Sequence, residues 1–305
     1  MSLPQPKGKL SNEVGQSGVI VAHYGVAVEV RFGDGRSCQV RVKRQSGHVV
    51  GDEVLVRGEV LHRQPRRTEM RRRDARGKIR LVAANLDVLG VVVCCTPPPP
   101  RHYLDRAIVA ARAAGIDPFL VVNKADLPAT AEFLDALQAV YGDLMPVFPV
   151  SAASGAGLDP LRHFLAQGHR AVFVGTSGVG KSSLLNALVP GIDLLIGDLS
   201  EDTGLGRHTT TVSTLHSLAS GGELVDTPGF RDFGLVDISE QELAHFFPGF
   251  EDIQQTPCRF RNCLHRNEPG CQVRSGLQAG KIPAERYDSY LYVLDNLQGD
   301  DPGWR

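Results

Sequence analysis

A glycine-rich stretch in the middle of the chain has the composition and spacing of a phosphate-binding loop. Residues 175–182 read Gly-Thr-Ser-Gly-Val-Gly-Lys-Ser, which matches the pattern G-x-x-x-x-G-K-[ST]. An apolar run at 171–174 precedes the loop, and a short helix is expected after it. In that setting backbone N–H groups and the helix N-terminus bind phosphate oxygens, Lys181 reaches the β- and γ-phosphates, and the Ser182 hydroxyl binds Mg²⁺. The alternative is a flexible glycine-rich loop without a ligand. The predicted nucleotide-binding residues are Gly175, Thr176, Ser177, Gly178, Val179, Gly180, Lys181, Ser182 and Ser183.

A second motif indicates which base such a site would bind. Asn123-Lys124-Ala125-Asp126 directly follows an apolar run and resembles the N-K-x-D motif of GTP-binding proteins. A carboxylate at Asp126 accepts hydrogen bonds from both N1–H and N2–H₂ of guanine, a pair of donors that adenine does not present. Asn123 would brace the loop, and Lys124 would lie along the base. Ser151-Ala152 follows another apolar run and resembles the S-A element whose backbone amide contacts guanine O6. The alternative for residues 123–126 is a turn with a helix cap.

Two further segments are placed to contact the γ-phosphate and a magnesium ion. Asp226-Thr-Pro-Gly229 resembles the D-x-x-G motif, in which Asp226 would hold Mg²⁺ through a water and the Gly229 amide would contact the γ-phosphate. The polar, glycine-rich residues 204–211 are positioned as switch I, and we expect Thr210 to complete the Mg²⁺ shell together with Ser182. Three threonines that simply open a strand are the alternative.

The residue that follows the D-x-x-G motif is unusual. It is Phe230, where Ras-like enzymes have a glutamine that orients the attacking water, and a phenyl ring cannot orient water by hydrogen bonding. Either another group orients the water or hydrolysis by the isolated protein is slow. His208 is the candidate catalytic residue, because it neighbours the threonines expected to bind Mg²⁺. Arg207 is either a source of positive charge for the transition state or a solvated loop residue.

Three of the six cysteines form a cluster with a histidine near the C-terminus. Three thiolates and one imidazole suit tetrahedral Zn²⁺ in a closed structural site, so we expect one zinc ion here. Cysteines that only fill a core are the alternative, and His245 is an alternative to the histidine of the cluster. The four predicted zinc ligands are Cys258, Cys263, His265 and Cys271.

The elements that must position these motifs alternate between apolar runs and helical patterns. We expect strands at 88–94, 119–122, 146–150, 171–174 and 223–225, and helices at 103–114, 131–140 and 158–167. Such a series predicts a mainly parallel sheet that is covered on both faces, with ligands at the carboxyl ends of its strands. A capping box at Ser239 and Glu242 opens a later helix, and residues 283–297 form the last one.

The segment before this series has a different pattern of apolar and polar residues. Residues 17–62 contain several short alternating runs with a hairpin signal at Asp34-Gly35, which is typical of a small antiparallel barrel. An OB-type barrel, whose surface binds oligonucleotides, is the natural candidate, and a fragment of a β-sandwich is the alternative.

The formal net charge of −1 is the sum of two unlike parts. Residues 1–80 hold 17 Lys and Arg against 8 Asp and Glu, whereas the remaining chain holds 16 against 26. This basic N-terminal segment, called the basic head below, suggests a polyanionic partner because the rest of the chain is acidic. Half of the 18 positions from Arg63 to Arg80 are basic. That run either contacts RNA or is a solvated linker. With no apolar run long enough to span a bilayer and no secretory signal, we expect a cytoplasmic protein that does not bind membranes. We also expect it to be a monomer.

The order of the motifs is the feature that points to a family. N-K-x-D and S-A precede the phosphate loop, switch I and D-x-x-G, whereas most GTPases have them last. With the barrel, the Gly206-Arg-His-Thr-Thr-Thr211 switch and the Cys/His cluster, residues 17–290 resemble the circularly permuted, small-ribosomal-subunit-dependent GTPases of the RsgA family. The resemblance implies a multidomain fold: an OB-fold RNA-binding domain (1–66), a permuted α/β P-loop GTPase domain (67–235) and a zinc-binding, mainly helical domain (236–305).

The same resemblance implies a function. It predicts a GTPase that binds GTP or GDP with Mg²⁺, contacts the small (30S) ribosomal subunit and its rRNA, and hydrolyses GTP during late subunit maturation. One alternative is an rRNA-binding adaptor that is clamped by GTP and hydrolyses little of it. Another is a metal-handling GTPase, which a closed Cys₃His site disfavours.

Overall fold

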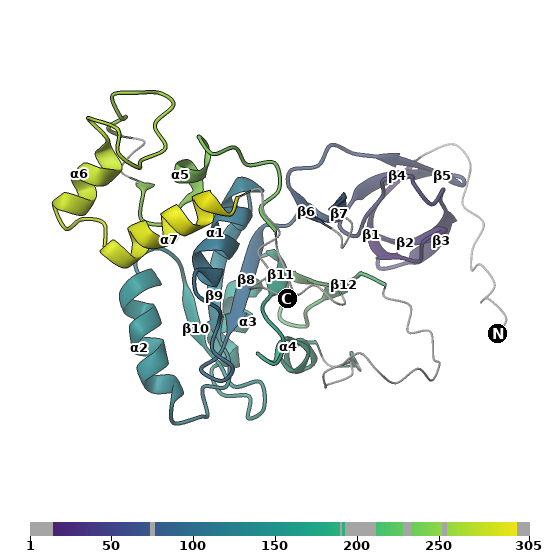
Figure 1. Ribbon diagram of the computed structural model, residues 1–305. Coiled ribbons are helices and arrows are strands. Elements are labelled where there is room, and N and C mark those ends of the chain that lie inside the picture. Colours follow the sequence, from purple (N-terminus) through teal and green to yellow (C-terminus); the bar gives the residue numbers. More distant parts are fainter. Residues whose placement is uncertain are drawn as a thin grey trace, which may run out of the picture.

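The computed structural model describes residues 15–73, 77–189, 191–192, 212–227, 234–251 and 255–297. Figure 1 shows a strand-rich N-terminal region at one end, an α/β layer in the middle and C-terminal helices at the other end. This arrangement is the predicted fold class. None of the helices within the described ranges is long and apolar enough to cross a membrane.

The N-terminal region is a small antiparallel barrel of five strands. They are β1 (Gln16–His23), β2 (Ala27–Phe32), β3 (Ser37–Arg41), β4 (Glu53–Arg57) and β5 (Val60–Arg63). β1 pairs with both β2 and β4, so the sheet curls around a core formed by every second residue of its strands. That core consists of Ile20, Val28, Val30, Phe32, Val40, Val54 and Val56. The expectation of a barrel is confirmed, and the sandwich fragment is not formed.

The basic run forms a β-hairpin that was not predicted. β6 (Glu69–Arg73) pairs with β7 (Ile79–Ala84) as a separate two-stranded sheet. Part of the positive charge of this region is paired with carboxylates of the same chain. Arg66, which precedes the hairpin, donates to the buried carboxylate of Asp52 at 2.6 Å, and Arg71 donates to Asp237 at 2.7 Å. The run therefore does more than link two domains.

The central sheet has the order β10-β9-β8-β11-β13-β12, and all of its strands except β12 are parallel. Its strands are β8 (Val88–Val93), β9 (Asp117–Val122), β10 (Val147–Pro149), β11 (Arg170–Val174), β12 (Thr214–Ser217) and β13 (Glu223–Asp226). Helices α1 (Tyr103–Ala113) and α2 (Thr130–Tyr141) cover one face, and α3 (Leu158–Leu165) and α4 (Lys181–Leu188) cover the other. The predicted strands and helices of this region all occur.

The barrel and the central sheet are joined through their edges. β12 pairs with β1 at Thr214 and Ala22, so one sheet runs from the α/β layer into the barrel. Glu223 lies at this joint and accepts hydrogen bonds from Arg31 of the barrel and from Arg170 of β11. The Arg31 contact thus ties the barrel to the central sheet at a carboxylate that Arg170 also holds.

The C-terminal region packs on α1. It contains α5 (Leu243–Phe246), α6 (Gln272–Gln278) and α7 (Ala284–Asp295), which share a core with α1 and α2. The predicted capping box is formed in part, because the Glu242 carboxylate accepts from the Ser239 backbone N–H at 3.1 Å. Arg286 of α7 donates to Asp105 of α1 at 2.5 Å, and both side chains are buried.

Candidate functional site

The predicted nucleotide motifs meet at the carboxyl edge of the central sheet. Residues 123–126 follow β9, residues 151–152 follow β10, residues 175–180 connect β11 to α4, and Asp226 ends β13. Since β8 to β11 and β13 are parallel, these ends lie at the same edge. The arrangement brings together all the predicted nucleotide-binding residues that the structure describes.

The side chain of Asn123 connects three of these loops. Its Nδ2 donates to the Val179 carbonyl of the phosphate loop at 2.9 Å, and its Oδ1 accepts from the Ala152 amide at 3.1 Å. The side chain is 2% exposed, so both hydrogen bonds are shielded from water. Asn123 therefore holds the phosphate loop and the two predicted base-binding segments in a fixed relation, as a bracing residue should.

The phosphate loop depends on glycine where it approaches Asn123. Gly180 has a φ of +91°, and a Cβ there would lie 2.3 Å from Asn123 Nδ2. A residue with a side chain would therefore displace the brace as well as strain the backbone. Beyond Gly180, α4 begins at Lys181, whose ammonium donates to the carbonyls of Gly175 and Thr176 at 2.5 and 2.9 Å.

The predicted guanine-binding segment is held by hydrogen bonds of its backbone and of the Lys124 side chain. Lys124 has a φ of +62°, which is uncommon for a residue with a side chain, and its Nζ donates to the Thr96 carbonyl at 2.7 Å. The Ala125 amide donates to the Val150 carbonyl at 2.9 Å, which ties this segment to the end of β10. The Asp126 side chain is exposed at the edge of the site.

Asp226 has the environment expected of a carboxylate that meets a cation. It is 7% exposed, and burial raises its pKa to about 6. A hydroxyl at Ser182 and a carboxylate oxygen at Asp226 are the hard donors that Mg²⁺ prefers. Three further predicted residues, Gly229, His208 and Thr210, lie outside the described part of the chain.

The Cys/His cluster is assembled as predicted. His265 Nδ1 lies 3.5 Å from the sulfurs of Cys258 and Cys263 and 3.4 Å from that of Cys271, and the four ligand atoms lie within 4.8 Å of one another. Tetrahedral Zn²⁺ with ordinary bond lengths requires nitrogen–sulfur separations of about 3.6 Å. The cluster, with His265 as its histidine, is therefore compatible with one zinc ion.

The chemistry of the cluster also favours a cation. Burial raises the pKa of Cys263 to about 12 and raises that of Cys271, so these thiols need a positive charge beside them to ionise. Burial lowers the pKa of His265, which favours the neutral imidazole that a metal requires. The amide of Gln272 donates to Cys258 Sγ at 3.2 Å, as expected around a metal-bound thiolate.

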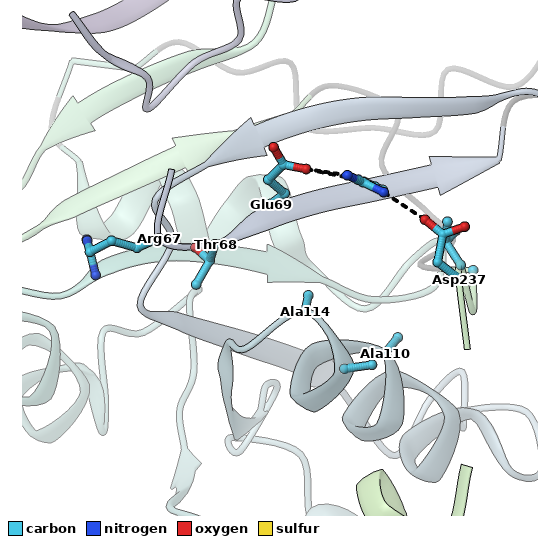
Figure 2. Close-up of a pocket in the computed structure, with 10 residues that line it drawn as sticks. Arg67, Thr68, Glu69, Ala110, Ala114 and Asp237 are labelled. Carbon is cyan, nitrogen blue, oxygen red and sulfur yellow. Dashed lines mark hydrogen bonds and ion pairs between the residues drawn. The ribbon is translucent and has the colours of Figure 1, made fainter. Parts of the chain in front are cut away.

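The segment that leaves the D-x-x-G motif runs along α1. Gly234, Val236 and Asp237 line a cavity of about 240 Å³ together with residues of β6 and α1. Glu69 and Asp237 are labelled among the lining residues in Figure 2, and the guanidinium of Arg71 donates to both carboxylates. No signal in the sequence predicts this contact.

Fold and site together define a circularly permuted P-loop GTPase with a barrel before it and a Cys/His cluster after it. Residues 63–236 match the family model of the RsgA GTPase. The chain is 44% identical over 297 residues to the small ribosomal subunit biogenesis GTPase RsgA of Pseudomonas aeruginosa, covering 94% of this chain and 87% of that protein. The protein of the same name from Pseudomonas syringae pv. tomato is 43% identical over 300 residues, covering 93% and 87%. This chain therefore belongs to the RsgA GTPase family.

Solved structures agree with the assignment. YjeQ from Thermotoga maritima matches with a TM-score of 0.75 and 28% identity over 94% of this chain and 100% of that one. YloQ, described as a circularly permuted GTPase, matches with a TM-score of 0.72 and 26% identity over 95% and 98%. The permuted fold inferred from the order of the motifs is confirmed.

Proposed function

We propose that this protein hydrolyses GTP on the small ribosomal subunit during late 30S maturation, as a monomer in the cytoplasm. The observation that carries the proposal is the double hydrogen bond of Asn123, which joins the predicted guanine-binding loops to the phosphate loop. The relatives from both Pseudomonas species are named as GTPases of small-subunit biogenesis, which supports the choice of partner.

In this proposal each nucleotide-binding motif has one task. Asp126 accepts from guanine N1–H and N2–H₂, and the Ala152 amide donates to guanine O6. The amides of residues 175–183 and the Lys181 ammonium bind the phosphates. Ser182 and Asp226, with Thr210, would hold a magnesium ion, which offsets negative charge on the β- and γ-phosphates.

Water activation is assigned to the switch segments. Because Phe230 has no hydrogen-bonding group, His208 orients the attacking water in our proposal, and the Gly229 amide contacts the γ-phosphate. His208→Ala is then expected to lower subunit-stimulated kcat far more than it weakens GTP binding. Equal turnover in the variant and the wild type would remove His208 from the mechanism.

The flanking regions are proposed to hold the subunit. We divide the chain into an rRNA-binding barrel at 1–66, the GTPase domain at 67–235 and a zinc-binding domain at 236–305. Cys258, Cys263, His265 and Cys271 would hold one Zn²⁺, which supplies the positive charge that lets buried thiolates persist. The basic head would contact phosphates, so binding should weaken steeply as salt rises.

The proposal is tested by single-turnover GTP hydrolysis with and without purified small ribosomal subunits. We expect strong stimulation by the small subunit and none by the large subunit, which serves as the matched control. A rate that the small subunit leaves unchanged would contradict the proposal and favour an adaptor that only binds GTP.

A further inference from the structure

Lys124, the left-handed residue of the guanine-binding segment, is held by hydrogen bonds from residues that follow it in the chain. The Lys124 carbonyl accepts two hydrogen bonds, one from the Leu127 amide at 3.0 Å and one from the Thr130 hydroxyl at 2.8 Å. A left-handed conformation costs a residue with a side chain about 1 kcal/mol, so it persists only where its surroundings hold it. The Thr130 hydroxyl is one of the groups that do so.

The environment of Thr130 directs its hydroxyl toward Lys124. Thr130 is 2% exposed and begins α2, and its own amide is satisfied by the Leu127 carbonyl at 2.9 Å. Its Oγ1 also lies 3.3 Å from Cys95 Sγ, two residues after the end of the neighbouring strand β8. A hydroxyl has one proton and a carbonyl only accepts, so Thr130 donates to Lys124 and the Cys95 thiol donates to Thr130.

Both ends of Lys124 are thus tied to the segment that follows β8. Its carbonyl is linked through Thr130 to Cys95, and its ammonium donates to the Thr96 carbonyl at 2.7 Å. Asp126 lies two residues after Lys124, and its side chain is exposed. The direction of the Lys124 peptide therefore determines where the Asp126 carboxylate points. A base-reading carboxylate gains selectivity from such a fixed direction.

We infer that Thr130 is a positioning residue for guanine recognition, which acts by holding the Lys124 peptide so that the Asp126 carboxylate faces the N1–H and N2–H₂ edge of the base. The inference rests on the proposed function, because it assumes that residues 123–126 bind guanine. It assigns part of the base selectivity to a residue outside the N-K-x-D motif. Thr130 touches neither phosphate nor base in this role.

The test compares Thr130→Val, which keeps the shape and removes the hydroxyl, with Thr130→Ser, which keeps the hydroxyl. Dissociation constants for GDP, IDP and ADP are measured by calorimetry on the full chain with Mg²⁺ and Zn²⁺ present. IDP lacks the N2 amine, so the ratio of IDP to GDP dissociation constants reports the contact between Asp126 and that amine. Thr68→Val is the matched control, because Thr68 Oγ1 also donates to a backbone carbonyl, that of Leu86 at 2.7 Å, ahead of β6.

We expect Thr130→Val to weaken GDP binding about tenfold, or ~1.4 kcal/mol, and to bring the IDP to GDP ratio closer to one. Thr130→Ser should restore both values, and Thr68→Val should change neither. Unchanged GDP affinity and ratio in a folded Thr130→Val variant would overturn the inference, as would an equal loss for GDP, IDP and ADP. If Thr130→Val does not fold, Thr130→Ala removes the same hydroxyl and is judged by the same ratio. A wild-type protein that binds ADP as tightly as GDP would contradict the proposed function itself.

Discussion

Two of the ion pairs that attach the C-terminal part of the chain to the rest differ in burial, and this difference predicts very different energies. Arg286 and Asp105 have side chains that are 5% and 7% exposed, whereas those of Arg71 and Asp237 are 45% and 54% exposed. We predict that Arg286→Met destabilises the protein by about 3 to 5 kcal/mol, because it leaves a buried carboxylate without its cation. Arg71→Met should cost at most about 1 kcal/mol, because water screens the exposed pair.

The contacts of Arg286 support the larger value. Besides Asp105, its guanidinium donates to the Val140 carbonyl at 2.8 Å and lies 4.7 Å from the centre of the Tyr141 ring. In Arg286→Met the Asp105 carboxylate still accepts a hydrogen bond from the Tyr141 hydroxyl, 3.0 Å away in the wild type. This neutral donor does not replace the positive charge of the lost guanidinium. Replacing both partners, as in Asp105→Leu with Arg286→Met, removes the unpaired charge and should recover most of the loss.

Urea unfolding of the zinc-loaded chain, followed by circular dichroism, gives the global change. Hydrogen–deuterium exchange of the α7 amides gives the change in local stability around this helix. Both measurements are needed because domains of one chain need not unfold together. A cost for Arg286→Met no greater than that for Arg71→Met would refute the argument from burial. A double variant as unstable as Arg286→Met would show that the loss comes from packing and not from the unpaired charge.

Three further predictions concern the two sites. The first is made without Mg²⁺ and nucleotide and compares the wild type with Asp226→Asn. As the pH rises from 3.8 to about 6, the free energy of unfolding of the wild type should fall relative to that of the variant by about 3 kcal/mol, at 1.36 kcal/mol per pH unit, because the folded state holds the Asp226 proton more tightly than the unfolded state does. The same pH dependence for both proteins in urea titrations would contradict this prediction. Gly180→Ala should weaken GDP binding by about 2 to 4 kcal/mol in calorimetry through strain and loss of the Asn123 brace, whereas Gly168→Ala, where a Cβ meets no atom within 4 Å, should leave it unchanged. Cys263→Ser should release zinc and speed amide exchange in α6 and α7 while GDP still binds, and a full zinc content measured by mass spectrometry would argue against the cluster.

Much of the site could be predicted because its chemistry is encoded in contiguous residues. The apolar run before each motif identified a strand of the central sheet, and parallel strands place their carboxyl ends at one edge. The cluster of Cys258, Cys263, His265 and Cys271 spans 14 positions, so its assembly needs only a local fold. Residues 204–211 remain a prediction, since they lie outside the described part of the chain.

The features that sequence reasoning missed depend on partners far along the chain. β6 contains three consecutive arginines, so no alternation of apolar and polar residues marks it as a strand. The Asp237 partner of Arg71 is 166 positions away, and the Arg31 partner of Glu223 is 192 positions away. The sequence alone assigns no role to Thr130, which lies just before the predicted helix at 131–140, because the left-handed conformation of Lys124 cannot be inferred from the N-K-x-D motif.

The different strengths of these two ion pairs also determine which contacts would break first if the segment after the D-x-x-G motif moved. Permutation makes the chain pass from Asp226 directly to Asp237, so a shift on γ-phosphate binding reaches the exposed Arg71–Asp237 pair first. That pair costs at most about 1 kcal/mol to break, whereas the buried Arg286 pair and the shared core hold α7 on α1. We therefore expect nucleotide-dependent differences in amide exchange at residues 234–238 and β6, with α7 unchanged between the GDP state and a non-hydrolysable GTP state. Equal changes across 236–297 would instead show that the whole C-terminal region moves as a lever.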